Sequence, residues 1–131
     1  MEAFIMVRKV YEAKNVDASG PYSHAVDAGE FVYFSGQTAK NSLNSENRNG
    51  DITAQTKQCF ANLFDVMEEA GVTSDDVVKV NVYLTTMKNF TAMNEEYKNH
   101  FNEPFPARTC IAVLELPLGA DVEIEIIAKK G

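Results

Sequence analysis

The chain has 131 residues, the size of one ordinary domain spanning residues 1–131, and its 45% apolar and 24% charged residues are typical of a globular protein. A formal net charge of −7, with no run of lysine and arginine, argues against nucleic acid as a partner. The two cysteines, Cys59 and Cys110, are too far apart in sequence for a C-x-x-C pair, which argues against a zinc site and against a disulfide framework.

The N-terminal third is predicted to be β-structure. Its β-branched and aromatic runs predict three strands: residues 4–11, 22–26 and 31–35. The last two form a hairpin around a turn that contains Gly29. Residues 31–34 are apolar on both faces, so we expect that strand to be covered on both sides. The polar residues 40–50 predict an exposed loop.

A long helix is predicted at residues 51–70, with Asp51 as its N-cap and Gly71 as its end. Six side chains recur at three- and four-residue spacing: Ile52, Thr56, Phe60, Leu63, Phe64 and Met67. Residues 77–85 then alternate as in a strand with one buried face. That buried face is predicted to carry four residues: Val78, Val80, Val82 and Leu84.

The C-terminal part is predicted to contain a second helix at 89–101 and two strands at 107–115 and 122–129. The order β-β-β-α-β-α-β-β predicts an α+β domain, a mixed β-sheet with both helices packed on one face. Apolar residues such as Ile124 and Ile126 cannot all lie under two helices. We therefore expect a homo-oligomer in which the second face of the sheet meets other subunits.

Arg108 and two glutamates near the C-terminus are the first candidates for chemistry. The Arg108 guanidinium is able to bind a carboxylate with two parallel hydrogen bonds, or to form an ordinary ion pair at the rim of the sheet. Glu123 and Glu125 share one strand face, where either is suited to act as a general base or to face solvent. The pattern gives no reason to prefer one glutamate over the other.

The spacing of these residues bears on where a site can form. If the last two strands form a simple hairpin, Glu123 lies opposite roughly residue 114, and Arg108 is about 20 Å further along at about 3.3 Å per residue. Arg108 and Glu123 then do not converge within one chain. A site that uses both is expected to span a subunit interface.

Other side chains allow two interpretations each. Cys110 is either a nucleophile or a small residue in a pocket, and no histidine has motif spacing to it. Tyr22 follows Gly20-Pro21, so its hydroxyl either contacts a ligand or packs. Gly36, at the end of a predicted strand, allows close approach of a ligand or of another backbone.

No stretch of 18 apolar residues exists, so no membrane span is predicted. The sequence begins without a basic segment followed by a long apolar one. We therefore expect no signal peptide and a cytoplasmic location.

Six blocks of the sequence, in this order, resemble the RidA family of enamine/imine deaminases, also called YjgF-like proteins. The blocks are Gly20-Pro21-Tyr22-Ser23, Phe34-Ser35-Gly36-Gln37, Ala54-Gln55-Thr56, Met93-Asn94-Glu95-Glu96-Tyr97, Pro106-Ala107-Arg108-Thr109 and Val122-Glu123-Ile124-Glu125. The resemblance implies a chorismate-mutase-like α+β fold and a homotrimer with clefts between subunits. It also implies hydrolysis of 2-imino acids to 2-keto acids and ammonia without a metal or an organic cofactor.

The resemblance also implies roles for single residues. Arg108 is similar to the family's carboxylate clamp, and Glu123 to its water-activating acid. The residues similar to its pocket lining are Tyr22, Ser35, Gly36, Asn94 and Cys110. The loop Lys40–Gly50 departs from the family because it lacks the proline-containing turn of close deaminases. Two other functions fit the family: a non-catalytic binder of small carboxylates, and an endoribonuclease, which the net charge of −7 disfavours.

Overall fold

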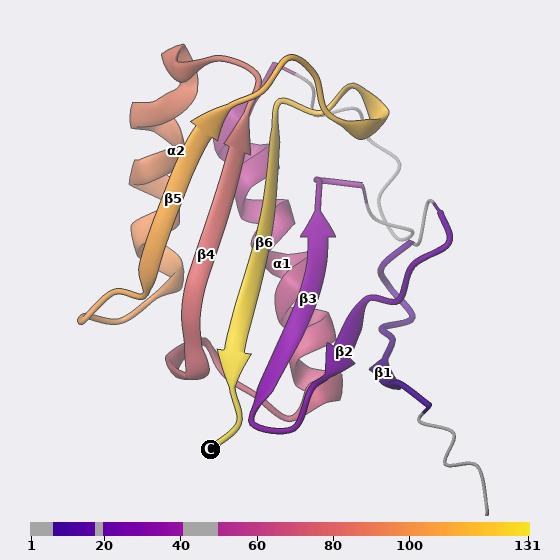
Figure 1. Cartoon of the computed structure of the whole chain (residues 1–131). Helices are drawn as coiled ribbons and strands as arrows, with labels where there is room; N and C mark the ends of the chain where they lie inside the picture. Colours follow the sequence, from indigo (N-terminus) through magenta and orange to yellow (C-terminus); the bar gives the residue numbers. More distant parts are fainter. Residues whose placement is uncertain (1–6, 18–19, 41–49) are drawn as a thin grey trace, which may run out of the picture.

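The computed structural model describes residues 7–17, 20–40 and 50–131 (Figure 1). The helices and strands occur in the predicted order, β-β-β-α-β-α-β-β. Their bounds are β1 Lys9–Tyr11, β2 Ala25–Asp27, β3 Phe31–Gln37, α1 Ile52–Ala70, β4 Val77–Leu84, α2 Phe90–Tyr97, β5 Ala107–Ala112 and β6 Val122–Lys129. Most of the predicted loop at 40–50, and residues 4–6 of the first predicted strand, lie outside the described residues.

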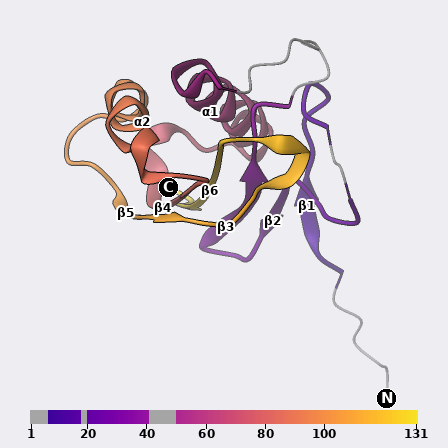
Figure 2. The same cartoon turned by 90° about the horizontal axis from the view of Figure 1, so that it is seen from above.

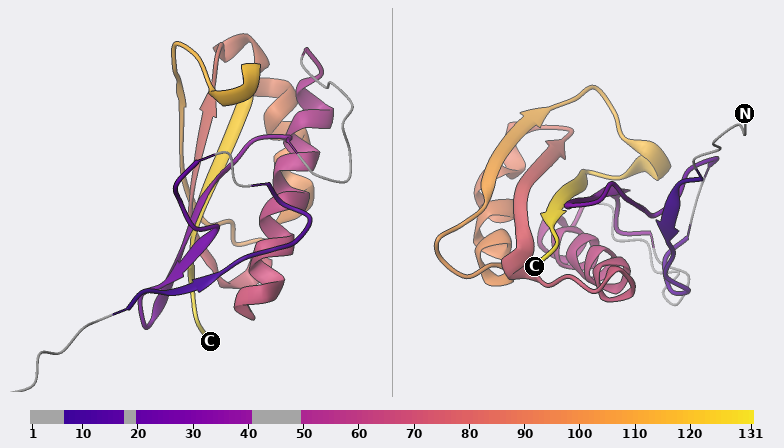
Figure 3. Two further views of the ribbon diagram at one scale, coloured as in Figure 1. Left: turned by 90° about the vertical axis from the view of Figure 1, so that its right-hand side faces the viewer. Right: turned by 60° about the horizontal axis from the view of Figure 1, so that its bottom comes forward.

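The six strands form one mixed sheet in the order β1-β2-β3-β6-β4-β5. Every neighbouring pair is antiparallel except β4 and β5, which are parallel because α2 carries the chain back between them. Both helices cover the same face of the sheet, as predicted (Figures 2 and 3). In the part of the chain that the structure describes, no α-helix lies on the other face.

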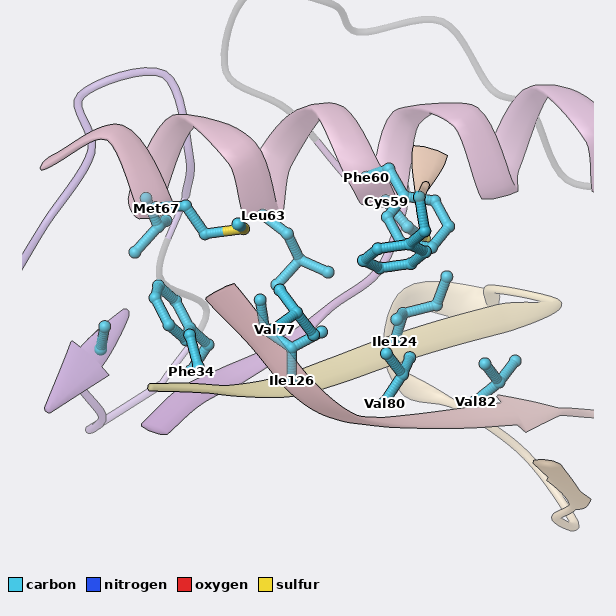
Figure 4. Packing of buried hydrophobic residues seen from close by; sticks show 14 of the residues in the cluster. Phe34, Cys59, Phe60, Leu63, Met67, Val77, Val80, Val82, Ile124 and Ile126 are labelled. Atoms are coloured by element: carbon cyan, nitrogen blue, oxygen red, sulfur yellow. The ribbon is translucent and has the colours of Figure 1, made fainter. Parts of the chain in front are cut away.

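Helix α1 begins and ends where its sequence signals predict. The Asp51 carboxylate accepts a hydrogen bond from the Ala54 amide at 3.0 Å, and Gly71 takes the left-handed conformation, with φ of 73°. The predicted stripe is buried at Thr56, Phe60, Leu63 and Met67. Figure 4 shows α1 lying over the β-strand side chains that complete the core.

The expected hairpin of the last two strands is wrong. Strand β6 lies between β3 and β4, and β5 pairs only with β4 at the edge of the sheet (Figure 1). Residues 113–121 are long enough to carry the chain across the end of β4, so adjacent strands in sequence are not adjacent in the sheet. Since β4 already pairs with β5 on one side, its other edge is left for β6.

Three burial predictions also need correction. Ile124 and Ile126 both lie under α1 and are 0% and 3% exposed, so they give no argument for an oligomer (Figure 4). Val78 is exposed because the register of β4 shifts between Val77 and Lys79, which puts Val77 in the core instead. Tyr33 is half-exposed within the chain, so β3 is covered by this subunit on one side only.

Candidate active site

Arg108 lies on the edge strand β5 and faces α2. Because strand residues alternate, Arg108 and Cys110 point to the helix side while Thr109 points away. Asn94 and Tyr97 are three residues apart on α2 and present their side chains to β5. The Arg108 Nη1 group donates a hydrogen bond to the Asn94 amide oxygen at 2.7 Å.

Two aromatic rings complete the environment of the guanidinium. Its central carbon lies 4.7 Å from the centre of the Tyr97 ring and 5.7 Å from that of Phe90. Burial raises the pKa of the Tyr97 hydroxyl to about 12, against a lowering by Arg108, so this ring stays neutral. The residues around the guanidinium line a pocket of about 280 Å³: Asn94, Tyr97, Lys98, Phe105, Pro106 and Arg108. The arginine is therefore held on one side and open to an anion on the other.

Cys110 lies on the same side of β5 and packs against the core. Burial raises the pKa of its thiol, and the nearby Arg108 charge opposes that shift. The thiol is therefore protonated at neutral pH, which does not suit a nucleophile.

Glu123 lies on β6 and points to the face of the sheet that carries no helix. Its neighbours Val122 and Ile124 are buried beneath α1, so alternation directs Glu123 the opposite way. The Glu123 side chain crosses Gly36 on β3 so closely that a Cβ atom there would lie 2.9 Å from its Oε1 atom. Gly36 sits where the register of β3 and β6 shifts, and only glycine leaves room for the carboxylate.

A pocket of about 120 Å³ borders the Glu123 carboxylate. It is lined by Asp17, Tyr22, Gly36, Gln37, Thr38, Lys40, Pro117, Leu118 and Glu123. Burial, and secondarily the charge of Glu125, raise the pKa of Glu123 above its ordinary value of 4.5. This carboxyl therefore exchanges its proton closer to neutral pH than a solvated glutamate does.

Ser35 has a structural contact rather than a pocket contact. Its hydroxyl donates to the Ser23 carbonyl oxygen at 2.6 Å, and its amide donates to the His24 carbonyl oxygen at 2.9 Å. Tyr22, by contrast, borders the pocket of Glu123, and its amide donates to the Gly20 carbonyl oxygen at 2.9 Å. The two hydrogen bonds of Ser35 thus tie the loop before β2 to the end of β3.

Glu125 differs from Glu123 although both share one face. Its carboxylate accepts hydrogen bonds from the Asn81 amide at 3.1 Å and from the Tyr83 hydroxyl. Both donors come from β4, the neighbouring strand. Glu125 is thus engaged within the sheet, whereas Glu123 borders a pocket.

Arg108 and Glu123 do not converge within one chain. On β4, Val80 is the partner of Arg108 and Tyr83 is the partner of Glu123. The two residues are therefore two strands apart across the sheet and three residues apart along it, which places their Cα atoms about 14 Å apart at ordinary strand spacings. Arg108 faces α2 and Glu123 faces the opposite side of the sheet. Within one chain, Arg108 and Glu123 therefore do not form a single site.

The sequence predicts that Arg108 and Glu123 do not meet within one chain, but this prediction assumes a hairpin of the last two strands that the sheet does not contain. The observed order of strands also keeps the two residues apart. The sequence analysis does not associate Phe90 and Tyr97 of the second predicted helix with Arg108. Their spacing of four and three residues around Asn94 is the signal that was available, because it puts all three on one side of α2.

Fold and pockets together describe a small α+β protein with two separate pockets, one beside a hydrogen-bonded arginine and one beside a partly buried glutamate. Residues 12–130 match the family model described as Endoribonuclease L-PSP. A 2-iminobutanoate/2-iminopropanoate deaminase of Dermatophagoides farinae is 44% identical over 108 residues, covering 82% of this chain and 84% of that protein. The chain therefore belongs to this family, which is also called the RidA, YjgF or RutC family. It is the family that the six sequence blocks resemble.

Solved structures of relatives have the same fold. RidA from an Antarctic Psychrobacter is 40% identical, with a TM-score of 0.87 over 94% of this chain and all of that one. The structure of E. coli TdcF with bound serine is 32% identical, with a TM-score of 0.87 over 94% of this chain and 99% of that one. The α+β fold with one mixed sheet and two helices is therefore confirmed.

Within residues 7–17, 20–40 and 50–131, no three histidine, cysteine, aspartate or glutamate side chains are grouped as a metal ion would require. None of the helices in these ranges is long and apolar enough to cross a membrane. One relative, protein MMF1 of Saccharomyces cerevisiae, is named as mitochondrial; it is 41% identical over 111 residues, covering 85% of this chain and 76% of that protein.

Proposed function

We propose that this protein is a 2-imino acid deaminase, which hydrolyses 2-iminobutanoate and 2-iminopropanoate to 2-keto acids and ammonia in the cytoplasm. The observation that carries the proposal is the pair of half-sites. Arg108 has the chemistry to hold a carboxylate, Glu123 has the chemistry to move a proton, and the two lie on opposite faces of the sheet. In a homotrimer with clefts between subunits, each cleft joins the Arg108 of one subunit to the Glu123 of the next.

The reaction needs few groups. Arg108 binds the substrate carboxylate through the guanidinium edge that Asn94 does not occupy. That fixes the imine carbon beside a water molecule that Glu123 deprotonates as a C–O bond forms. The product of this step is a carbinolamine. Because the imine nitrogen enters protonated, that carbinolamine is neutral. Glu123 then transfers its proton to the amino nitrogen, and the C–N bond breaks to release ammonia. The hydroxyl oxygen forms the C=O bond of the 2-keto acid, and its proton passes to Glu123 and on to solvent.

The environment of Glu123 suits both proton transfers. A carboxyl with a pKa raised by burial is a stronger base once ionised than a solvated glutamate, and it is a ready acid after it has taken the proton. Tyr22 lines the same pocket, beside the space that the substrate would occupy. Gly36 keeps the carboxylate within reach of that space.

Subunit mixing tests the arrangement directly. Arg108→Ala and Glu123→Gln chains are each expected to be inactive as homotrimers in a coupled assay that generates the imine with a threonine dehydratase. After co-refolding in equal amounts, random assembly gives one intact Arg108 and Glu123 pair in about one quarter of the clefts. Activity should therefore recover to about a quarter of the wild-type value.

Other outcomes would point to an alternative. If the site lies within one chain, the mixture recovers no activity. If the molar mass in solution is that of a folded monomer, a cleft between subunits is excluded. A binder of small carboxylates, which the serine-bound relative makes a concrete second candidate, binds 2-keto acids saturably without accelerating imine hydrolysis. RNA cleavage that survives Glu123→Ala and further purification supports the ribonuclease activity that the family description names.

A further inference from the structure

Three polar side chains on the open face of the sheet form a connected group beside Glu123. Glu125 accepts hydrogen bonds from the Tyr83 hydroxyl and, at 3.1 Å, from the Asn81 amide. All three are half-buried. The proposed imine chemistry uses none of them, although β4 brings Tyr83 directly opposite Glu123 in the strand register.

The two donors fix the Glu125 carboxylate in place, because the Tyr83 hydroxyl and the Asn81 amide both reach it from the neighbouring strand β4. The effect on the donor is visible at Tyr83, whose pKa is raised to about 12, first by its hydrogen bond to Glu125. Tyr83 therefore stays protonated and keeps donating across the whole physiological range. The Glu125 carboxylate is thus held in a fixed position.

That anion lies close to Glu123. Residues i and i+2 of a strand point to the same side, and their side chains leave the backbone about 6.6 Å apart. At that distance, and in a partly buried setting, two like charges repel appreciably. An ionised Glu125 therefore makes it harder for Glu123 to lose its proton.

We propose that Glu125, held by Tyr83 and Asn81, is a positioning residue that sets the protonation state of Glu123. The proposal rests on the proposed deaminase function for its kinetic meaning, since only there does the proton of Glu123 matter to a rate. It gives the second glutamate of the Val122-Glu123-Ile124-Glu125 block a role distinct from that of the first. One glutamate moves the proton, and the other determines how tightly that proton is held.

Other groups besides Glu125 also face Glu123. On β6 the group is Glu125, and on β4 it is the neutral Tyr83; β3 presents the Gly36 backbone. The pocket wall adds three residues: Asp17, Tyr22 and Lys40. From α1, the buried Cys59 thiol is neutral because burial, and then the charge of Glu123, raise its pKa. Glu125 is the group whose charge contributes to the raised pKa of Glu123, after burial itself.

The test is the pH dependence of imine hydrolysis, corrected for the uncatalysed reaction at each pH. In Glu125→Gln, the acid limb of the kcat/KM profile should move to lower pH, so that the rate one pH unit below the wild-type midpoint rises about threefold relative to the plateau. Glu125→Asp keeps the charge and should keep the limb near its wild-type position. Glu69→Gln removes one charge from the exposed surface of α1, on the other side of the sheet, and should leave the limb unchanged.

A second measurement does not depend on activity. The carboxyl carbon of Glu123, assigned by its loss in Glu123→Gln, is titrated by NMR in ¹³C-glutamate-labelled protein. Its midpoint should fall in Glu125→Gln and not in Glu69→Gln. If neither protein hydrolyses the imine but this midpoint falls, the deaminase proposal fails and the effect of Glu125 stands.

The positioning role is overturned if folded Glu125→Gln keeps both the acid limb and the Glu123 midpoint of the wild type. Tyr83→Phe serves where Glu125→Gln does not fold, with circular dichroism and molar mass as the criteria. It removes one donor, so the Glu125 carboxylate is free to turn away from Glu123, and both readouts should move in the same direction by a smaller amount. An unchanged or opposite movement in Tyr83→Phe contradicts the proposal as well.

Discussion

The contact between Gly36 and Glu123 makes a sharp prediction for Gly36→Ala. A methyl group at residue 36 would lie 2.9 Å from Glu123 Oε1, 3.1 Å from its Cδ and 3.2 Å from its Cγ. Ordinary contacts begin near 3.4 Å, so the carboxylate must move by about half an ångström. Since a displacement of 1 Å in a reacting group can cost on the order of a hundredfold in rate, half of that predicts a loss of about tenfold in kcat/KM.

The same substitution should leave the fold intact. Gly36 is not in the left-handed region, so alanine is compatible with its backbone and reduces the freedom of the unfolded chain by about 0.4–1 kcal/mol. The group that must yield is the end of a half-buried side chain rather than a backbone atom. We expect the melting temperature to change by no more than about 3 °C.

The assay is steady-state imine hydrolysis, and its control is a double-mutant cycle. In a Glu123→Ala background the methyl group has no carboxylate to displace, so adding Gly36→Ala should change neither the residual rate nor 2-keto acid binding by more than about twofold. The reasoning is refuted if Gly36→Ala hydrolyses the imine at the wild-type rate. It is equally refuted if the tenfold loss persists in the absence of the Glu123 side chain.

Three further outcomes follow from the same geometry. Asn94→Ala releases the Arg108 guanidinium, and the Kd for 2-keto acids should rise about fivefold with kcat little changed; an unchanged Kd contradicts the clamp. The folded state binds the Glu123 proton more tightly than the unfolded chain, so ionisation costs stability as pH rises; Glu123→Gln should melt roughly 1–3 °C higher at pH 8, with a gap that closes towards pH 4, and a constant gap argues against it. Cys59 is 0% exposed, so a thiol reagent should modify only Cys110 in the native protein and both cysteines after unfolding.

Local sequence signals predicted the elements because each signal acts over a few residues. Asp51 and Gly71 mark the ends of α1 through a cap and a left-handed residue, and both effects are complete within one helical turn. The alternation of residues 122–129 likewise predicts β6 with its correct bounds. The burial predicted from the period of β4 holds at Val80 and Val82.

The order of strands was not predictable in the same way. The choice between a β5–β6 hairpin and insertion of β6 beside β4 depends on which edge of β4 remains free after α2 has returned the chain. That is a property of the whole sheet and not of residues 113–121. The shift of register at Val77 and Lys79 is similar, because one extra residue exchanges which valine is buried and nothing in the alternating pattern marks it.

The candidate site shows the same difference between what local sequence signals indicate and what depends on tertiary contacts. Arg108, Gly36 and the pair Glu123 and Glu125 could be singled out from residue type and position, but only the resemblance to the RidA family favoured Glu123 over Glu125. The rings of Phe90 and Tyr97 beside Arg108 were missed because apolar spacing on a helix indicates burial without indicating which polar group is buried alongside. Ser35, expected in the pocket, instead ties β3 to the Ser23 backbone, a contact that depends on the path of the preceding loop.

In the proposed trimer, assembly would change the chemistry of each half-site as well as bring the two together. Within one chain, Arg108 and Glu123 are half-buried and still contact water. Covering both would strengthen the attraction between the guanidinium and a substrate carboxylate, because the same charges interact more strongly where water is excluded. It would also raise the pKa of Glu123 further by desolvation, unless the bound substrate or the approaching Arg108 offsets that effect. The acid limb of the rate profile is then a property of the assembled cleft, and Glu125 acts on it from within the sheet that every subunit carries.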